Sequence, residues 1–221
     1  LLFEKTTKRD WRWMKICYPG MKSIAGHCIT PSDPLFDSFF PAARFYTFLR
    51  EPVSRSISHY QFLINGGHRV PPLEAWLEEN ADFMTCRLAG EANAEKAIEI
   101  LEEKVSFVGL MEHFDESLLL WREWAELPDL EIRYSFVNRA PTDSTKRDIL
   151  SDEKHLSLIR EANQEDAKLY RHVVEKTMER QRAAYGISLD SDLDQFRKSL
   201  AESSPPPGNT RGAKWKRNLV Y

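Results

Sequence analysis

The segment from Phe45 to Tyr60, which reads Phe-Tyr-Thr-Phe-Leu-Arg-Glu-Pro-Val-Ser-Arg-Ser-Ile-Ser-His-Tyr, constrains the fold more than any other stretch. Its first five residues are apolar or aromatic apart from one threonine, which is the pattern of a short buried strand. Pro52 suits the first turn of a helix, because its φ is already helical and its missing N–H is not needed there. The segment therefore predicts a strand over 45–49 that runs directly into a helix.

Two polar side chains in this segment are candidates for binding an anion. Arg50 falls at the carboxyl end of the expected strand, where open α/β sheets bind ligands, and Ser58 lies about two helical turns further on. A cation at a strand end and a hydroxyl on the next helix can converge on one phosphate. Arg55 shares a helix face with Ser58 and either joins this pair or only balances an acid. A surface ion pair is likewise the alternative for Arg50.

The pattern Leu49-Arg50-Glu51-Pro52-x-x-Arg55-x-x-Ser58-x-Tyr60 resembles the 3′-phosphate-binding segment of sulfotransferases that use 3′-phosphoadenosine 5′-phosphosulfate (PAPS). The resemblance is to the carbohydrate sulfotransferases that include heparan sulfate 2-O-sulfotransferase and its bacterial relatives. These usually have Asp where this chain has Glu51, a change that keeps the charge. Two later segments resemble the same family, Phe107-Val-Gly-Leu-x-Glu-His-Phe-Asp-Glu-Ser117 and Asn163-x-x-Asp-x-x-Leu-Tyr170, and their expected roles are architectural.

The resemblance implies an α/β domain with a parallel sheet flanked by helices, a P-loop-like sulfotransferase fold. It implies in-line transfer of a sulfuryl group from PAPS to a hydroxyl, on a carbohydrate or another hydroxyl-bearing acceptor, without a metal. Arg50 and Ser58, with Arg55 as a third candidate, would hold the 3′-phosphate. His27, in a Gly-His pair upstream of the strand, would be the general base, since a neutral imidazole can take the proton of the attacking hydroxyl. A structural role is the alternative for His27.

A loop for the 5′-phosphosulfate is the part of this pattern that the sequence does not provide. Such loops combine Lys, Gly, Thr and Ser, and their N–H groups and lysine neutralise the leaving phosphate. Lys5-Thr6-Thr7-Lys8 has matching residue types but no glycine and no preceding apolar strand. We therefore expect the loop upstream of Leu1, in an N-terminally truncated domain. Two alternatives stay open: a non-catalytic relative that binds a glycan or a protein, and another nucleotide-dependent transferase such as a kinase.

Length and composition limit the remaining choices. At 221 residues and 42% hydrophobic, the chain can bury one core, so we expect one sulfotransferase domain over 1–202 (core 22–185) and a proline-rich linker with a basic tail over 203–221. That tail either contacts an anionic polymer or is simply solvated. A net charge of −3 argues against nucleic-acid binding, and no apolar run is long enough for a membrane span. The lack of an Asn-x-Ser/Thr site favours a bacterial cytoplasmic location over the Golgi lumen.

Periodicity and turn residues predict the other elements. The expected elements are the end of a helix within 1–13, strands over 22–29, 105–110 and 131–138, a polar loop over 139–147, and helices over 73–79, 92–104, 118–127, from 153 onward and over 173–185.

Overall fold

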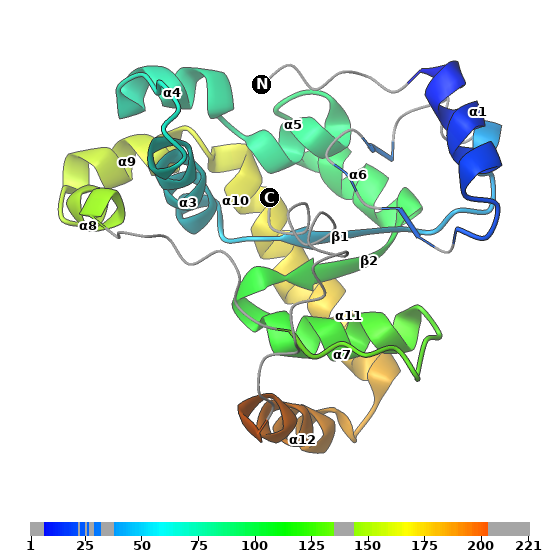
Figure 1. Ribbon diagram of the computed structural model, residues 1–221. Helices are drawn as coiled ribbons and strands as arrows, with labels where there is room; N and C mark the ends of the chain where they lie inside the picture. Colours follow the sequence, from blue (N-terminus) through cyan, green and yellow to red (C-terminus); the bar gives the residue numbers. More distant parts are fainter. Residues whose placement is uncertain are drawn as a thin grey trace.

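The computed structural model describes residues 7–21, 23–24, 26, 29–31, 38–134 and 144–202. These residues are mostly helical and include two strands, β1 (Phe45–Leu49) and β2 (Val105–Leu110) (Figure 1). The helices, in chain order, are α1 (Lys8–Cys17), α3 (Pro52–Asn65), α4 (Leu73–Asn80), α5 (Phe83–Ala89), α6 (Ala94–Lys104), the 3₁₀ turn η1 (Met111–His113), α7 (Phe114–Trp124), α8 (Ser144–Leu150), α9 (Glu153–Glu161), α10 (Gln164–His172), the π-helical turn η2 (Val173–Thr177), α11 (Met178–Tyr185) and α12 (Leu189–Glu202).

The two strands form a parallel pair, and the sequence predicted the bounds of both correctly. Phe45 aligns with Val105 and Leu49 with Leu110, so both strands end at the same edge of the sheet. The chain passes through α3, α4, α5 and α6 between them. A parallel pair needs a long crossover of this kind, because a hairpin can join only antiparallel strands. The prediction of an α/β fold with a parallel sheet flanked by helices is confirmed at this level of detail.

Aromatic side chains cover the face of the sheet that α7 packs against. Tyr46 contacts the rings of Trp121 and Trp124, with ring centroids 5.5 and 6.1 Å apart. Phe48 stands beside Gly109 in the register, and a Cβ on that glycine would lie only 2.5 Å from the Phe48 ring. Glycine is therefore required at position 109 for the ring to lie over β2. Helices α5 and α6 lie on the opposite side of the sheet (Figure 1).

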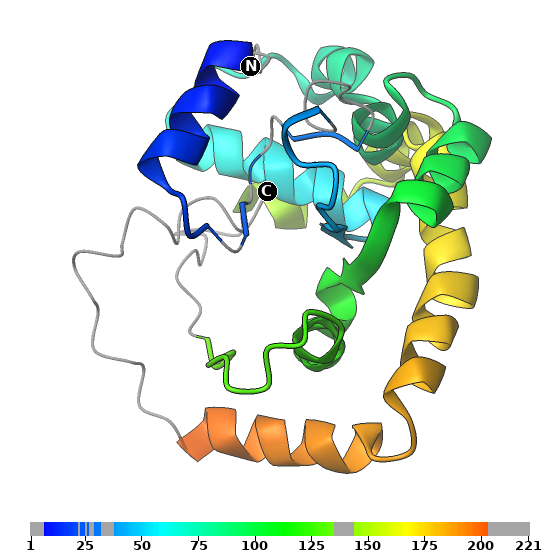
Figure 2. The ribbon, with the colours of Figure 1, turned by 90° about the vertical axis from the view of Figure 1, so that its right-hand side faces the viewer.

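A side chain closes the outer edge of β2. The amide of Gln181 accepts from the Val108 N–H at 3.0 Å and donates to the Val108 carbonyl at 2.8 Å. It thereby takes the hydrogen bonds that a neighbouring strand would otherwise make, which protects an exposed strand edge. Gln181 lies on α11, and Figure 2 shows α10 and α11 descending as one yellow-to-orange column to α12.

The buried apolar residues fall into two main clusters. The larger cluster surrounds the sheet and includes Phe107, Leu101 and Leu169, and the smaller one lies among α3, α4, α8 and α9 around Ile57 and Ile159. A third, small cluster joins α12 to α7 through Phe196 and Leu119 and their neighbours. The single-core prediction therefore corresponds to a core in several adjoining parts.

Most of the expected helices are present, often with bounds shifted by a few residues. α3 begins at Pro52 as predicted, with the side chain of Glu51 as its cap, and Gly67 just beyond its end has a φ of 72°. The expected helix over 118–127 begins earlier, at Phe114. α9 begins after Asp152, whose carboxylate accepts from Lys154 N–H at 2.9 Å.

Four local predictions were wrong. α1 begins inside the chain, at Lys8, because Thr7 and Asp10 form a capping box; the expected helix tail over 1–13 missed this start. Residues 23–24, 26 and 29 are not in a strand, although one was expected over 22–29. Residues 131–134 are also irregular, where a strand was expected. Ser144 to Arg147, expected in a loop, belong to α8.

Candidate functional site

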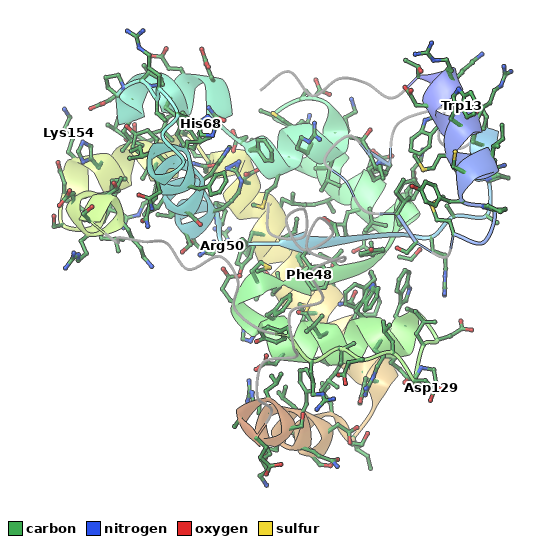
Figure 3. The ribbon with its side chains drawn as sticks, in the orientation of Figure 1. Trp13, Phe48, Arg50, His68, Asp129 and Lys154 are labelled. Carbon is green, nitrogen blue, oxygen red and sulfur yellow. The ribbon has the colours of Figure 1, made fainter. Side chains whose placement is uncertain are left out.

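The carboxyl edge of the two-stranded sheet carries Arg50. This residue directly follows β1, and Figure 3 shows it at the junction between that strand and α3. Its side chain is half-buried and makes no hydrogen bond or ion pair with any residue that the structure describes. The surface ion pair that was the alternative for Arg50 is therefore not found among these residues. A partly buried cation without a partner is a suitable group for holding an anionic ligand.

The amino terminus of α3 is occupied by a carboxylate of the protein itself. Glu51 accepts hydrogen bonds from the N–H groups of Val53 at 3.0 Å and Ser54 at 2.7 Å. These amides are the donors that a phosphate would use at a helix start. An anion at this edge must therefore be held by side chains such as Arg50 rather than by the α3 backbone.

Ser58 is the second predicted phosphate ligand. It lies in α3, about 9 Å along the helix axis from Pro52, on a helix that begins two residues after Arg50. Its side chain is half-buried, and its hydroxyl has no hydrogen-bond partner within the described ranges. One strand-helix unit thus carries a cation and a hydroxyl that are both available to bind a ligand.

Arg55 has a different environment, although it lies on the same helix. Its guanidinium stacks on the ring of Phe83 in α5, with its Cζ atom 4.1 Å from the ring centroid. Burial lowers the pKa of Arg55 to about 10, while the nearby carboxylate of Asp166 acts in the opposite direction. Both terminal nitrogens are buried without a hydrogen-bond partner in the described chain, and Arg55 forms no ion pair there. Its predicted pairing with an acid is limited to this charge interaction with Asp166.

Two acids, Asp166 and Asp82, cap the amino termini of α5 and α10 reciprocally. Asp166 in α10 accepts from the N–H groups of Met84 at 3.0 Å and Thr85 at 2.7 Å, at the start of α5. Asp82, just before α5, accepts from the N–H groups of Glu165 at 2.8 Å and Asp166 at 2.9 Å, at the start of α10. Burial is the main cause that raises the pKa of Asp82. The Asn163-to-Tyr170 motif was expected to pack, and its Asp166 also joins these two helices.

Other members of that motif also contact the candidate site. Asn163 is buried and accepts a hydrogen bond from the Ser56 hydroxyl in α3 at 3.3 Å. Leu169 points into the core and the half-buried Tyr170 packs against it, both as expected, and the Tyr170 hydroxyl also donates to Glu112 at 2.9 Å. The sequence had assigned Tyr170 only a packing role.

Glu112 is the residue at this edge that sequence reasoning missed. It is the second residue after β2, as Glu51 is the second residue after β1, and its other carboxylate oxygen accepts from the Glu51 N–H at 3.0 Å. The signal was present in the sequence, because the carboxyl ends of parallel strands meet at one edge.

The Phe107-to-Ser117 motif otherwise has the architectural role expected of it. Ser117 bonds the backbone of Leu110, and Glu116 forms a two-point ion pair with Arg182.

His27, the candidate base, lies outside the described residues, as does the tail over 203–221. A second arginine, Arg87 in α5, also lies near the Phe83 ring, with its Cζ atom 5.9 Å from the centroid. The described residues contain no group of three His, Cys, Asp or Glu side chains arranged to hold a metal. No helix in this part of the chain has both the length and the apolar character needed to cross a lipid bilayer.

Comparison with known proteins adds no relative to this picture. No protein-family model matches the chain, and searches of curated proteins and of solved structures also found no match.

Proposed function

We propose that the chain binds the 3′-phosphate of PAPS at the carboxyl edge of its sheet and acts as a carbohydrate sulfotransferase with a P-loop-like fold. The observation that supports this most is that Arg50, directly after β1, and Ser58, in the helix that follows, both lack a hydrogen-bond or ion-pair partner within the described chain. A guanidinium and a hydroxyl are donors that match phosphate oxygens. The two acids that follow the strand ends, Glu51 and Glu112, accept hydrogen bonds from groups other than Arg50.

Each protein group has a definite role in this proposal. Arg50 and Ser58 fix the ribose end of the donor, and Arg55, on the same helix as Ser58, is a third candidate. His27 removes the proton from the acceptor hydroxyl as it attacks. PAPS supplies the sulfuryl group. Positioning of donor and acceptor in line accounts for much of the rate of such transfers.

The binding claim is tested by calorimetry with the desulfated product, 3′-phosphoadenosine 5′-phosphate (PAP). Arg50→Ala should weaken PAP binding by about 1.5–3 kcal/mol, the usual size of a charge-assisted hydrogen bond. Arg44 is the matched control, because it flanks the other end of β1 and already contacts Glu126 at 3.4 Å and the Trp124 ring at 4.7 Å. Arg44→Ala should leave PAP affinity unchanged. Equal affinities for wild type and Arg50→Ala would remove Arg50 from the site.

The transfer claim has a separate test. His27→Ala should lower sulfuryl transfer from PAPS by about 10²–10⁴-fold while PAP binding is retained, since the residue acts on the acceptor proton. Full activity of the variant would mean that another group is the base. Transfer of a labelled phosphoryl group from ATP instead of a sulfuryl group from PAPS would identify the chain as a kinase-like transferase.

One observation favours a second candidate function, a non-catalytic protein that binds a nucleotide-bearing or acidic partner at the same edge. Neither described strand is followed by a glycine-rich loop that could hold a 5′-phosphosulfate: Arg50-Glu51-Pro52 follows β1, and Met111-Glu112-His113 follows β2. PAP binding without measurable transfer to any carbohydrate hydroxyl would support this alternative.

A further inference from the structure

The three sequence motifs meet at the peptide that joins Arg50 to Glu51. Glu112 comes from the Phe107-to-Ser117 motif, Tyr170 ends the motif that begins at Asn163, and Glu51 belongs to the first motif. Glu112 accepts the Glu51 N–H at 3.0 Å through one oxygen and the Tyr170 hydroxyl at 2.9 Å through the other. Residues 51, 112 and 170, far apart in the sequence, are thus joined by one carboxylate.

This arrangement explains why Arg50 has no partner among the described residues although two carboxylates lie at the same edge. Both oxygens of Glu112 accept hydrogen bonds, and both oxygens of Glu51 accept from the α3 backbone. A carboxylate that already accepts good hydrogen bonds is held in place and has less to gain from moving to a cation. Burial, followed by the hydrogen bond to Glu112 and its charge, raises the pKa of Tyr170, so its hydroxyl keeps the proton that it donates.

We propose that Glu112 and Tyr170 are positioning residues for Arg50. Glu112 fixes the peptide that follows Arg50. The hydrogen bond from Tyr170 keeps the Glu112 carboxylate from pairing with the Arg50 guanidinium, so that Arg50 stays available for a phosphate. This inference rests on the proposed function, and it assigns a role in ligand binding to two motifs that otherwise serve only the fold. A preorganised side chain loses less freedom when its ligand binds.

Tyr170→Phe is the most selective variant, because it removes one hydroxyl and keeps the ring in place. It should weaken PAP binding about three- to tenfold, the range of coupling between neighbouring groups. Tyr185→Phe is the matched control, since the Tyr185 hydroxyl donates to an acid in the same way, to Asp192 at 3.0 Å, but does so between α11 and α12. Its PAP affinity should equal that of the wild type.

A double-mutant cycle separates positioning from a general loss of stability. If Tyr170 acts through Arg50, Tyr170→Phe should have no further effect on PAP affinity in an Arg50→Ala background. An equal loss in both backgrounds would overturn the inference, as would an unchanged affinity of Tyr170→Phe alone. If the wild-type chain itself binds no PAP, the proposed function fails and this inference with it. Binding by the wild type without any effect of Tyr170→Phe would refute only the positioning role.

Discussion

Arg50 and Arg55 are five positions apart and have opposite surroundings. Arg50 is half-buried at a strand end without a partner in the described chain, whereas Arg55 is packed over Phe83 with its terminal nitrogens buried. Burial disfavours the charged form of a base, which is why the pKa of Arg55 falls to about 10. Side chains of one type in one motif can therefore differ in the role that each is able to perform.

Another residue, Glu102, is held by several donors at once. It accepts from Arg180 at 2.6 Å, from His172 at 3.0 Å and from Thr177 at 3.4 Å, around the π-helical turn η2. Partial burial alone would raise the pKa of Glu102, but the hydrogen bonds from Arg180 and His172 outweigh it and hold the pKa below the usual 4.5. The folded state therefore favours the charged carboxylate.

Glu102→Gln should lower the free energy of unfolding by about 0.5–1 kcal/mol near pH 7, the scale of a partly exposed ion pair. Because the folded pKa is the lower one, this contribution is present above about pH 4.5 and is lost as the pH falls further. The difference from wild type, measured by urea unfolding, should shrink accordingly. The neighbouring Glu103 is exposed and has no partner among the described residues, so Glu103→Gln should show no such difference. A Glu102→Gln effect that persists unchanged at low pH would contradict this assignment.

Part of the candidate site could be predicted at the residue scale. The position of Arg50 at a strand end and of Ser58 on the next helix followed from the apolar run and from Pro52. The partners of Glu112 and Tyr170 could not be predicted in this way, because they join residues 58 or more positions apart. Local patterns predict which element a residue belongs to but not which distant side chain it meets.

Between elements, the contact of β1 with β2 depends on Gly109. A Cβ at this position would lie 2.5 Å from two atoms of the Phe48 ring, and that ring also packs against Phe107 and Phe114. The ring has little room to move, because it has aromatic neighbours with centroids 6.0 and 5.8 Å away.

Gly109→Ala should therefore cost about 1–3 kcal/mol of unfolding free energy, the usual penalty of overpacking. The loss should be smaller in a Phe48→Leu background, because the smaller side chain leaves room for the new methyl group. Thermal or urea unfolding of the two single variants and the double variant measures this coupling. Strictly additive losses would show that the ring is not what excludes a side chain at position 109.

The elements were predicted best where apolar residues are dense. Both strands were correct to the residue, since each is a mostly apolar run interrupted by a single threonine or serine. α8 was missed because only Ile149 of its seven residues is buried, which is too little for a periodic pattern. Residues 131–134 alternate as a strand would, but of these four only Ile132 is buried, against α7 and α12. Glu131 and Arg133 form an exposed ion pair with each other. The start of α1 was missed because an aspartate, rather than the more usual glutamate, completes its capping box.

On the scale of the whole molecule, polar groups connect parts of the structure that apolar packing leaves separate. Helix α10 contributes Leu169 to the cluster around the sheet, whereas no residue of α10 belongs to the cluster among α3, α4, α8 and α9. Asp166 and Asn163 bind α5 and α3 from there, and Tyr170 reaches the end of β2. The three sequence motifs are thus linked to one another by hydrogen bonds, at the Glu51 N–H and at the Ser56 hydroxyl.

The proposed 3′-phosphate site is tested most directly by calorimetry with two ligands that differ in that group alone. Wild-type protein should bind PAP about 10- to 100-fold more tightly than adenosine 5′-monophosphate, since the 3′-phosphate contributes about 1.5–3 kcal/mol. Arg50→Ala should reduce this preference to a few fold while leaving the affinity for the monophosphate unchanged. Equal wild-type affinities for the two ligands, or a preference that survives Arg50→Ala, would contradict the assignment of this site.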